Sequence, residues 1–239
     1  MRSLSPEPGD VDLAEAYAYP PGGVWLRANM VTSLDGAAQR EGRSGGLGNA
    51  ADRHLFLLLR GLADVVIVGA GTVRTEGYGP VKPSAGWDGV RAGRSPVPPL
   101  AIVSRTLDLD FDAPVFTEAK ARTIVLTAAT ADPARLEAAR ARADVIVAGK
   151  DTLDFAAAVK ELEARGHRRL LCEGGPGVLA QVVAAGLLDE LCLTLSPLLL
   201  AGHPARMLDG PPLSVPPEME LAHALLDEDF LFLRYTRNR

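Results

Sequence analysis

The feature that most constrains this chain is a strand-length apolar run that meets a glycine turn and continues as a helical pattern. Residues 170–172 form the run, residues 173–177 read Glu-Gly-Gly-Pro-Gly, and apolar side chains then recur on one helical face, at Leu179, Val182, Val183 and Leu187. Glycine lets a backbone approach a ligand, Pro176 suits the first helical position, and the amides of a helix N-terminus attract phosphate. The pattern predicts a phosphate-binding turn of an α/β domain, and an ordinary β-to-α connection is the alternative.

A second strand followed by glycines lies earlier in the chain. Residues 65–68 are a β-branched run typical of a strand covered on both faces, and Gly69-Ala70-Gly71 follows directly. This turn lacks the third glycine of GxGxxG, so it is a weak indication of a dinucleotide fold by itself. Glu173 ends the other strand, where open α/β sheets bind ligands. We therefore expect one crevice that both turns line and that Glu173 faces.

Four further residues are candidates for ligand contact. Asp35 belongs to a Thr-Ser-Leu-Asp-Gly turn after the predicted strand 24–30, and this turn either faces a ligand or is an ordinary Asp-Gly turn. Arg60 lies on the predicted helix 51–62, where it would suit a phosphate monoester or be a solvated charge. Ser104 and Arg105 follow the predicted strand 100–103 and either grip the additional phosphate of an NADP-type cofactor or form a polar strand exit.

The remaining patterns predict the fold class. Strands are expected at 123–126 and 145–147, helices from Pro133 and over 155–164, and an antiparallel hairpin within 221–235. Alternation of strands and helices predicts an α/β fold, a mixed sheet with helices on both faces that ends in this hairpin. Residues 1–22 are expected to be a loose N-terminal tail and 23–239 a single domain.

One long segment has too many helix and strand breakers for a regular element. Residues 77–99 contain five glycines and five prolines, and this composition predicts a loop. Loops of this length are often lids or substrate-contacting segments, and disorder is the alternative.

Composition excludes several classes of partner. The net charge is −5, and no basic stripe is interleaved with aromatic residues, so nucleic acid is not an expected partner. The two cysteines lie in apolar strand patterns, which fits a reducing cytoplasm, and the four histidines lack the spacing of a metal site. The longest apolar run, 191–201, is interrupted by polar residues and proline and is shorter than the roughly 20 residues of a membrane helix. No signal sequence is seen. We expect a cytoplasmic protein without metal, membrane or nucleic-acid partner.

Three motifs, taken together and in order, resemble the pyrimidine reductases of riboflavin biosynthesis. They are residues 32–36, residues 68–74 and residues 172–176, and the similarity extends over about residues 24–235. The resemblance implies a dihydrofolate-reductase-like fold, a homodimer, and NADPH-dependent reduction of 5-amino-6-(5-phosphoribosylamino)uracil to the ribitylamino product. Many members also carry an N-terminal zinc deaminase domain with HxE and PCxxC motifs. This chain has neither motif, so we expect a stand-alone reductase.

The resemblance also implies roles for individual residues. Substrate contacts are implied for Ser44, Arg60 and Glu173, and cofactor contacts for Thr72, Glu76, Ser104, Arg105, Gly174, Gly175, Pro176, Gly177, Val178, Leu179 and Gln181. Glu76 replaces the aspartate that is usual in the family. The family then shows Asn-Pro and a substrate-binding arginine, whereas this chain reads Gly-Tyr-Gly-Pro-Val-Lys, in which Lys82 could supply the positive charge.

The implied chemistry requires hydride transfer to C1′ of the sugar, which must be an open-chain imine or an equivalent electrophile, and an acid that supplies a proton. Asp35 and Glu173 are the candidate catalytic residues; their alternative roles are a turn former and a carboxylate at a helix N-terminus. Two other functions stay open. One keeps the fold and cofactor but reduces a pterin or another small carbonyl compound. The other is a non-catalytic nucleotide-binding paralogue, suggested by the altered sequence after Glu76.

Overall fold

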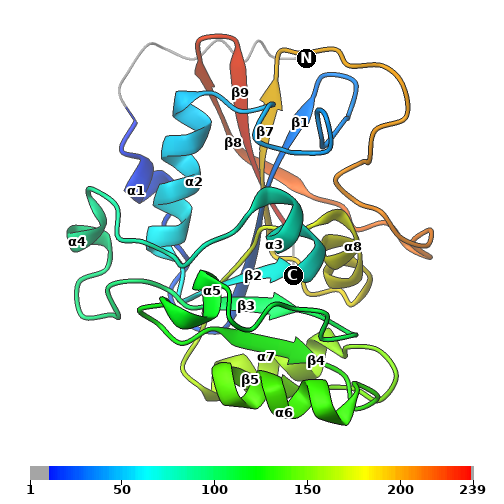
Figure 1. Ribbon diagram of the computed structural model, residues 1–239. Coiled ribbons are helices and arrows are strands. Elements are labelled where there is room, and N and C mark those ends of the chain that lie inside the picture. The colour runs from blue at the N-terminus through cyan, green and yellow to red at the C-terminus, as the bar shows by residue number, and fades with distance from the viewer. Residues whose placement is uncertain (1–10, 238–239) are drawn as a thin grey trace.

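The computed structural model describes residues 11–237, in which nine strands form one mixed sheet (Figure 1). The order across the sheet is β5-β4-β3-β2-β6-β1-β7-β9-β8. The strands are β1 Trp25–Ser33, β2 Val65–Gly69, β3 Leu100–Val103, β4 Ile124–Thr127, β5 Asp144–Val147, β6 Arg169–Cys172, β7 Glu190–Ser196, β8 Glu220–Asp227 and β9 Phe230–Thr236.

Seven strands, β1 to β7, pair in parallel, and the β-branched run at β2 lies near the middle of them. All five residues of β2 are buried, because helices cover the sheet on both of its faces here. The parallel register sets Ile67 beside Cys172, so the carboxyl ends of β2 and β6 lie next to each other. The two predicted glycine turns therefore begin side by side.

Helices cover both faces of the sheet and form two separate core clusters with it. Helices α2 to α5 contribute side chains to one cluster, and α7 and α8 to the other. The helices are α1 Leu13–Ala16, α2 Ala50–Leu62, α3 Ala70–Glu76, α4 Trp87–Val90, α5 Pro114–Thr117, α6 Pro133–Arg142, α7 Phe155–Ala164 and α8 Pro176–Ala184. Each of α2, α6 and α7 is capped by the Asn or Asp before it, as helix N-termini favour.

The C-terminal hairpin completes the sheet as predicted. Strand β9 pairs antiparallel with β7 and β8 antiparallel with β9, which makes the sheet mixed. The expected fold class is thus confirmed: a mixed sheet, helices on both faces and a closing antiparallel hairpin.

The expectation of a loose N-terminal tail is wrong for residues 12–19. Asp12 caps α1, Tyr17 is fully buried in the core, and the ring of Tyr19 packs on the guanidinium of Arg27 at 4.1 Å. Two aromatic side chains in this short stretch provide enough apolar area to anchor it. Residues 1–10 of the predicted tail lie outside the described residues.

Residues 77–99 are mostly loop, as predicted, but they contain α4 and pack on the C-terminal end of α2. Trp87 is 3% exposed, and its indole nitrogen donates to the Leu57 carbonyl at 3.0 Å. The Arg91 guanidinium donates to the carbonyls of Gly61 and Ala63, which the end of a helix leaves without intrahelical partners. Disorder therefore does not describe this segment, whose α4 part covers the C-terminal end of α2.

Candidate active site

The two glycine turns meet at the carboxyl ends of β2 and β6. The Gly69 amide donates to the Gly174 carbonyl at 2.7 Å, and Gly174 and Gly175 are joined by a cis peptide bond. A Cβ on Gly69 would lie 3.0 Å from the Val178 side chain, so any residue other than glycine would crowd Val178 here. The prediction that both turns line one crevice is confirmed, and in Figure 1 the helices that follow them, α3 and α8, lie beside each other.

A cleft of about 1070 Å³ opens over these turns. Most of the residues expected at the cofactor line it, namely Thr72, Glu76, Ser104, Arg105, Gly175, Pro176, Gly177, Val178 and Gln181. Gly174 and Leu179 do not line it. Leu179 is 1% exposed and packs in the core, because it lies on the face of α8 that covers the sheet.

The cleft fits a dinucleotide in shape and in chemistry. A Cβ on Gly175 would lie 2.6 Å from the Thr72 hydroxyl oxygen, so only glycine leaves room between α3 and the start of α8. No side chain caps α8, and its first residues line the cleft, where unpaired amides of a helix N-terminus attract a pyrophosphate. The volume exceeds that of many drug-sized ligand sites.

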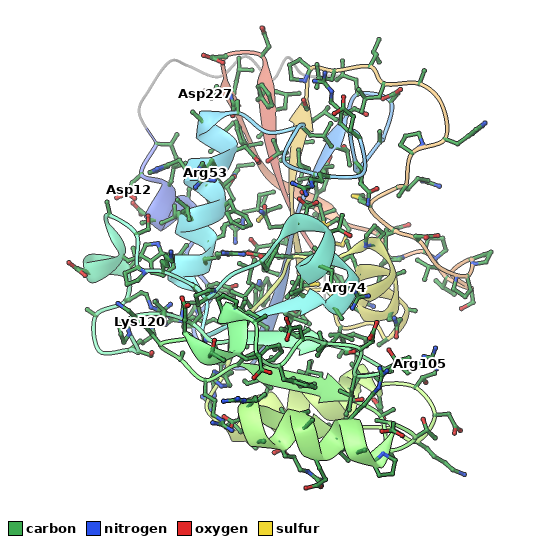
Figure 2. The ribbon with its side chains drawn as sticks, in the orientation of Figure 1. Asp12, Arg53, Arg74, Arg105, Lys120 and Asp227 are labelled. Carbon is green, nitrogen blue, oxygen red and sulfur yellow. The ribbon has the colours of Figure 1, made fainter. Side chains whose placement is uncertain are left out.

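Two arginines give one end of the cleft a positive charge. Arg105 follows β3, beside the buried Ser104, and Arg74 lies on α3 with its guanidinium bonded to the Asp108 carbonyl at 2.7 Å. Figure 2 shows both on the right-hand side, far from Arg53 on α2. Sequence reasoning proposed Arg105 but missed Arg74, because Arg74 lies only two residues after Thr72 and this helical spacing does not put the two on one face.

One wall of the cleft comes from the long connection between β7 and β8. Residues 209–215 line it, and the Asp209 amide donates to the Pro176 carbonyl at 3.3 Å. A Cβ on Gly210 would lie 2.9 Å from that of Ala180, so this loop packs closely on α8. No local pattern in the sequence indicates this contact, because it joins segments about 30 residues apart.

The expectation that Glu173 faces the cleft is wrong. Its side chain is 2% exposed and turned toward α2, where Arg60 donates from Nε to Oε1 and from Nη2 to Oε2, each at 2.7 Å. The Tyr78 hydroxyl donates to Oε2 at 2.8 Å. Three donors thus converge on this carboxylate, and the substrate-binding Arg60 and Glu173 expected from the sequence are a bidentate ion pair.

Aromatic rings enclose the Arg60 guanidinium. The ring of Phe56 lies 4.2 Å from it and the ring of Tyr78 5.1 Å from it. Burial opposes the charge of Arg60, but Glu173 outweighs it and holds the pKa of the guanidinium above its ordinary value. Burial and the Glu173 charge together raise the pKa of Tyr78 well above its ordinary value, so its hydroxyl stays protonated.

The other two expected substrate residues are Ser44 and Lys82, and neither lines the cleft. The Ser44 amide donates to Glu76 Oε1 at 2.7 Å, so the Glu that replaces the family aspartate ties residue 44 to the C-terminal end of α3. Lys82 is exposed and does not line the cleft.

Asp35 forms a structural tie between two loops. Its carboxylate accepts hydrogen bonds from the Ser33 hydroxyl and from the amides of Leu200 and Ala201. The Ser33 hydrogen bond, followed by that of the Ala201 amide, lowers the pKa of Asp35. An exposed carboxyl group that releases its proton this readily is poorly suited to act as an acid, and it does not line the cleft.

Among residues 11–237, no group of three or more His, Cys, Asp or Glu side chains is arranged to hold a metal ion. Within the same residues, no helix has the length and apolar character needed to cross a membrane.

Sequence comparison places this chain among riboflavin-biosynthesis proteins. Residues 24–231 match the RibD C-terminal domain. A 2,5-diamino-6-ribosylamino-4(3H)-pyrimidinone 5′-phosphate reductase from Archaeoglobus fulgidus is 27% identical over 75% of this chain and 83% of its own length. The protein of the same name from Aquifex aeolicus is 32% identical over 64% of this chain and 65% of its own length.

Solved structures give the same picture. A pyrimidine reductase-like protein from Corynebacterium diphtheriae superposes with a TM-score of 0.81 and 30% identity, over 90% of this chain and 92% of that one. A riboflavin biosynthesis reductase from Saccharomyces cerevisiae superposes with a TM-score of 0.67 over 94% and 95% of the two chains. At 18% sequence identity, this superposition shows a shared fold alone.

Proposed function

Because the chain belongs to the RibD C-terminal domain family, we infer that it is a pyrimidine reductase of riboflavin biosynthesis. The observation that carries this function is the family match over residues 24–231, and the cleft that the two glycine turns line supports it. The enzyme is an oxidoreductase that acts on a phosphorylated pyrimidine.

The substrate is a 6-(ribosylamino)pyrimidine 5′-phosphate. The reaction expected from the sequence uses the uracil form, whereas the names of the curated relatives specify the 2,5-diamino-4(3H)-pyrimidinone form. Both forms carry the same ribosylamino 5′-phosphate, and the carbon that is reduced, C1′, belongs to this shared part. The two forms differ only on the pyrimidine ring, so a direct comparison of their turnover decides between them.

The cofactor is NADPH, which supplies the hydride when it is bound. The amides at the start of α8 hold the pyrophosphate, and Thr72 and Glu76 line the cleft from α3. Ser104 and Arg105 hold the 2′-phosphate that distinguishes NADPH from NADH, because a guanidinium pairs well with phosphate oxygens.

The chain's own groups bind and orient the substrate. Arg60 and Glu173, already paired, form a rigid polar wall of the substrate site, to which Ser44 and Lys82 add contacts from neighbouring loops. Glu173 accepts three hydrogen bonds and Asp35 has a lowered pKa, so neither is assigned the transfer of a proton. Positioning of the reacting carbon is the main contribution of the protein.

The test is a direct assay. The purified chain is incubated with NADPH and each of the two ribosylaminopyrimidine phosphates, and oxidation of NADPH is followed at 340 nm while the ribitylamino product is identified by mass spectrometry. Turnover of either compound supports the function. Turnover of a pterin in place of both compounds would favour a reductase of pterins or other small carbonyl compounds. Tight binding of NADPH that none of these compounds oxidises would favour a non-catalytic paralogue.

The protein acts as a homodimer in the cytoplasm. A partly exposed apolar face on β7, β9 and β8 supports the dimer. Paired residues share a face of the sheet, and here they form three rows, Leu191-Tyr235-Leu221, Leu193-Leu233-Ala224 and Leu195-Leu231-Leu226. All nine are partly buried or exposed, and Leu226 is 55% exposed. A contiguous apolar patch of this kind marks an association site.

The state of the cysteines supports the proposed cytoplasmic location. Both cysteines are free and buried, which is consistent with a reducing compartment.

A further inference from the structure

Tyr78 is a polar aromatic residue at the active site to which neither the sequence motifs nor the family resemblance gives a role. It follows Gly77, which ends α3 in the left-handed conformation at φ 69°, and the Tyr78 amide donates to the Val73 carbonyl at 2.9 Å. This sharp turn, which favours glycine, directs the chain from the cleft-lining helix α3 back toward α2 and β6. Tyr78 therefore joins the cofactor side of the site to the Arg60–Glu173 pair.

Two contacts of Tyr78 act on that pair at once. Its hydroxyl donates to Glu173 Oε2 at 2.8 Å, and its ring lies 5.1 Å from the Arg60 guanidinium, which the Phe56 ring also approaches, at 4.2 Å. Nε and Nη2 of Arg60 are both used by Glu173. The two hydrogen bonds from Arg60 to Glu173 do not use Nη1, and the Arg60 side chain keeps 14% of its surface exposed.

We propose that Tyr78 is a positioning residue that fixes the Arg60–Glu173 pair in one orientation and so leaves Nη1 of Arg60 to bind an oxygen of the substrate. A guanidinium held by two rings and a carboxylate loses little conformational freedom when the substrate arrives. A hydroxyl bonded to a carboxylate makes a charge-assisted hydrogen bond, and its loss lets the carboxylate and its partner arginine turn. This role rests on the proposed reductase function.

The test is steady-state kinetics of Tyr78→Phe, which removes the hydroxyl and keeps the ring. We expect the KM for the ribosylaminopyrimidine phosphate to rise roughly tenfold, because the freed carboxylate and arginine must be ordered again when the substrate binds. We expect kcat to change less than about twofold and the Kd for NADPH to stay near its wild-type value, while the melting temperature falls by only a few degrees, roughly the effect of losing one buried hydrogen bond. Tyr19→Phe is the matched control, because the Tyr19 hydroxyl also donates one hydrogen bond, to the Leu170 carbonyl, away from the cleft.

A double-mutant cycle with Glu173→Gln then tests whether Tyr78 acts through Glu173. Non-additive effects on KM are expected, because the two residues share one hydrogen bond. Additive effects overturn the proposal, and so does an unchanged KM or a loss of the folded state in Tyr78→Phe. Absence of turnover by the wild-type protein is a different result, since it rejects the reductase function itself.

Discussion

Gly175 is the residue at which the cofactor cleft leaves least room. We expect Gly175→Ala to raise the Kd for NADPH at least tenfold, because the added Cβ would lie 2.6 Å from the Thr72 hydroxyl and would push α3 or α8 out of place. Tenfold corresponds to about 1.4 kcal/mol. Calorimetric titration with NADPH measures the change. Gly89→Ala in α4 is the control: Gly89 does not line the cleft, nothing lies within 4 Å of its Cβ position, and affinity is expected to stay within about threefold.

Arg105 decides which dinucleotide is preferred. We expect Arg105→Ala to raise the KM for NADPH roughly tenfold and to leave the KM for NADH nearly unchanged, because only NADPH carries the 2′-phosphate that a guanidinium would pair with. Arg53→Ala removes an exposed arginine of α2 on the other side of the molecule in Figure 2 and serves as the control. Equal losses with both cofactors would place Arg105 away from that phosphate.

At the scale of the elements, α4 packs so closely on α2 that glycine is expected to be more stable than alanine at position 61 of α2. We expect Gly61→Ala in α2 to destabilise the protein by about 1–2 kcal/mol, although alanine favours a helix by about 1 kcal/mol over glycine. The reason is that a Cβ at this position would lie 2.7 Å from the indole nitrogen of the buried Trp87.

The control for this prediction lies in another helix. Gly71 in α3 has nothing within 4 Å of its Cβ position, so Gly71→Ala is expected to stabilise by about 0.5–1 kcal/mol. Urea unfolding followed by tryptophan fluorescence gives both values. The same sign for the two substitutions would contradict the tight packing of residues 77–99 on α2.

At the scale of the whole molecule, Glu190 joins elements that are distant in sequence. Its fully buried carboxylate accepts hydrogen bonds from Trp25 and Arg27 of β1 and from Arg234 of β9. Burial raises the pKa of Glu190, but the charge of Arg27, supported by Arg234, outweighs it and leaves the pKa below its ordinary value. This carboxylate therefore stabilises the folded state fully at pH values above the ordinary glutamate pKa of about 4.3. The stabilisation is lost as the pH falls through the lower pKa that Glu190 has in the folded state.

We expect Glu190→Gln to lower the free energy of unfolding at pH 7 by about 3 kcal/mol, because two arginines would lose their buried counter-ion. The stability of this variant should also decrease less between pH 5 and pH 3 than that of the wild type. Urea titrations over this pH range test both expectations. Glu161→Gln, which removes a half-exposed pair with Arg165, should change stability by less than about 0.5 kcal/mol.

The apolar face on β7, β9 and β8 gives a prediction for the assembly. We expect Leu226→Asp to convert the proposed dimer into a monomer of 25.2 kDa, because a charge buried between two copies has no partner. Light scattering after gel filtration measures the mass. Leu199→Asp changes a leucine that is 75% exposed in the loop after β7 and belongs to none of the three rows, and it should leave the mass unchanged. A wild-type monomer would reject the dimer.

The sequence by itself determined many of the elements and the two glycine turns. The apolar runs at β2 and β6 and the helical spacing in α2, α7 and α8 are local patterns, so each could be identified from neighbouring residues. The glycines of both turns also predict their use, because backbone amides come close to a ligand only where side chains are small. That the turns share one cleft followed from the rule that parallel strands meet ligands at their carboxyl ends.

Tertiary structure alone decided what the charged side chains do. Arg60 and Glu173 are 113 residues apart in the chain, and no spacing in the sequence reveals that they form one ion pair with Tyr78 beside them. In the same way, Tyr17 became part of the core and the 209–215 loop became a wall of the cleft. The physical reason is that a charge or a ring responds to whichever groups the folded chain places within a few ångströms, whereas strand and helix formation depends on residues that are already close in sequence.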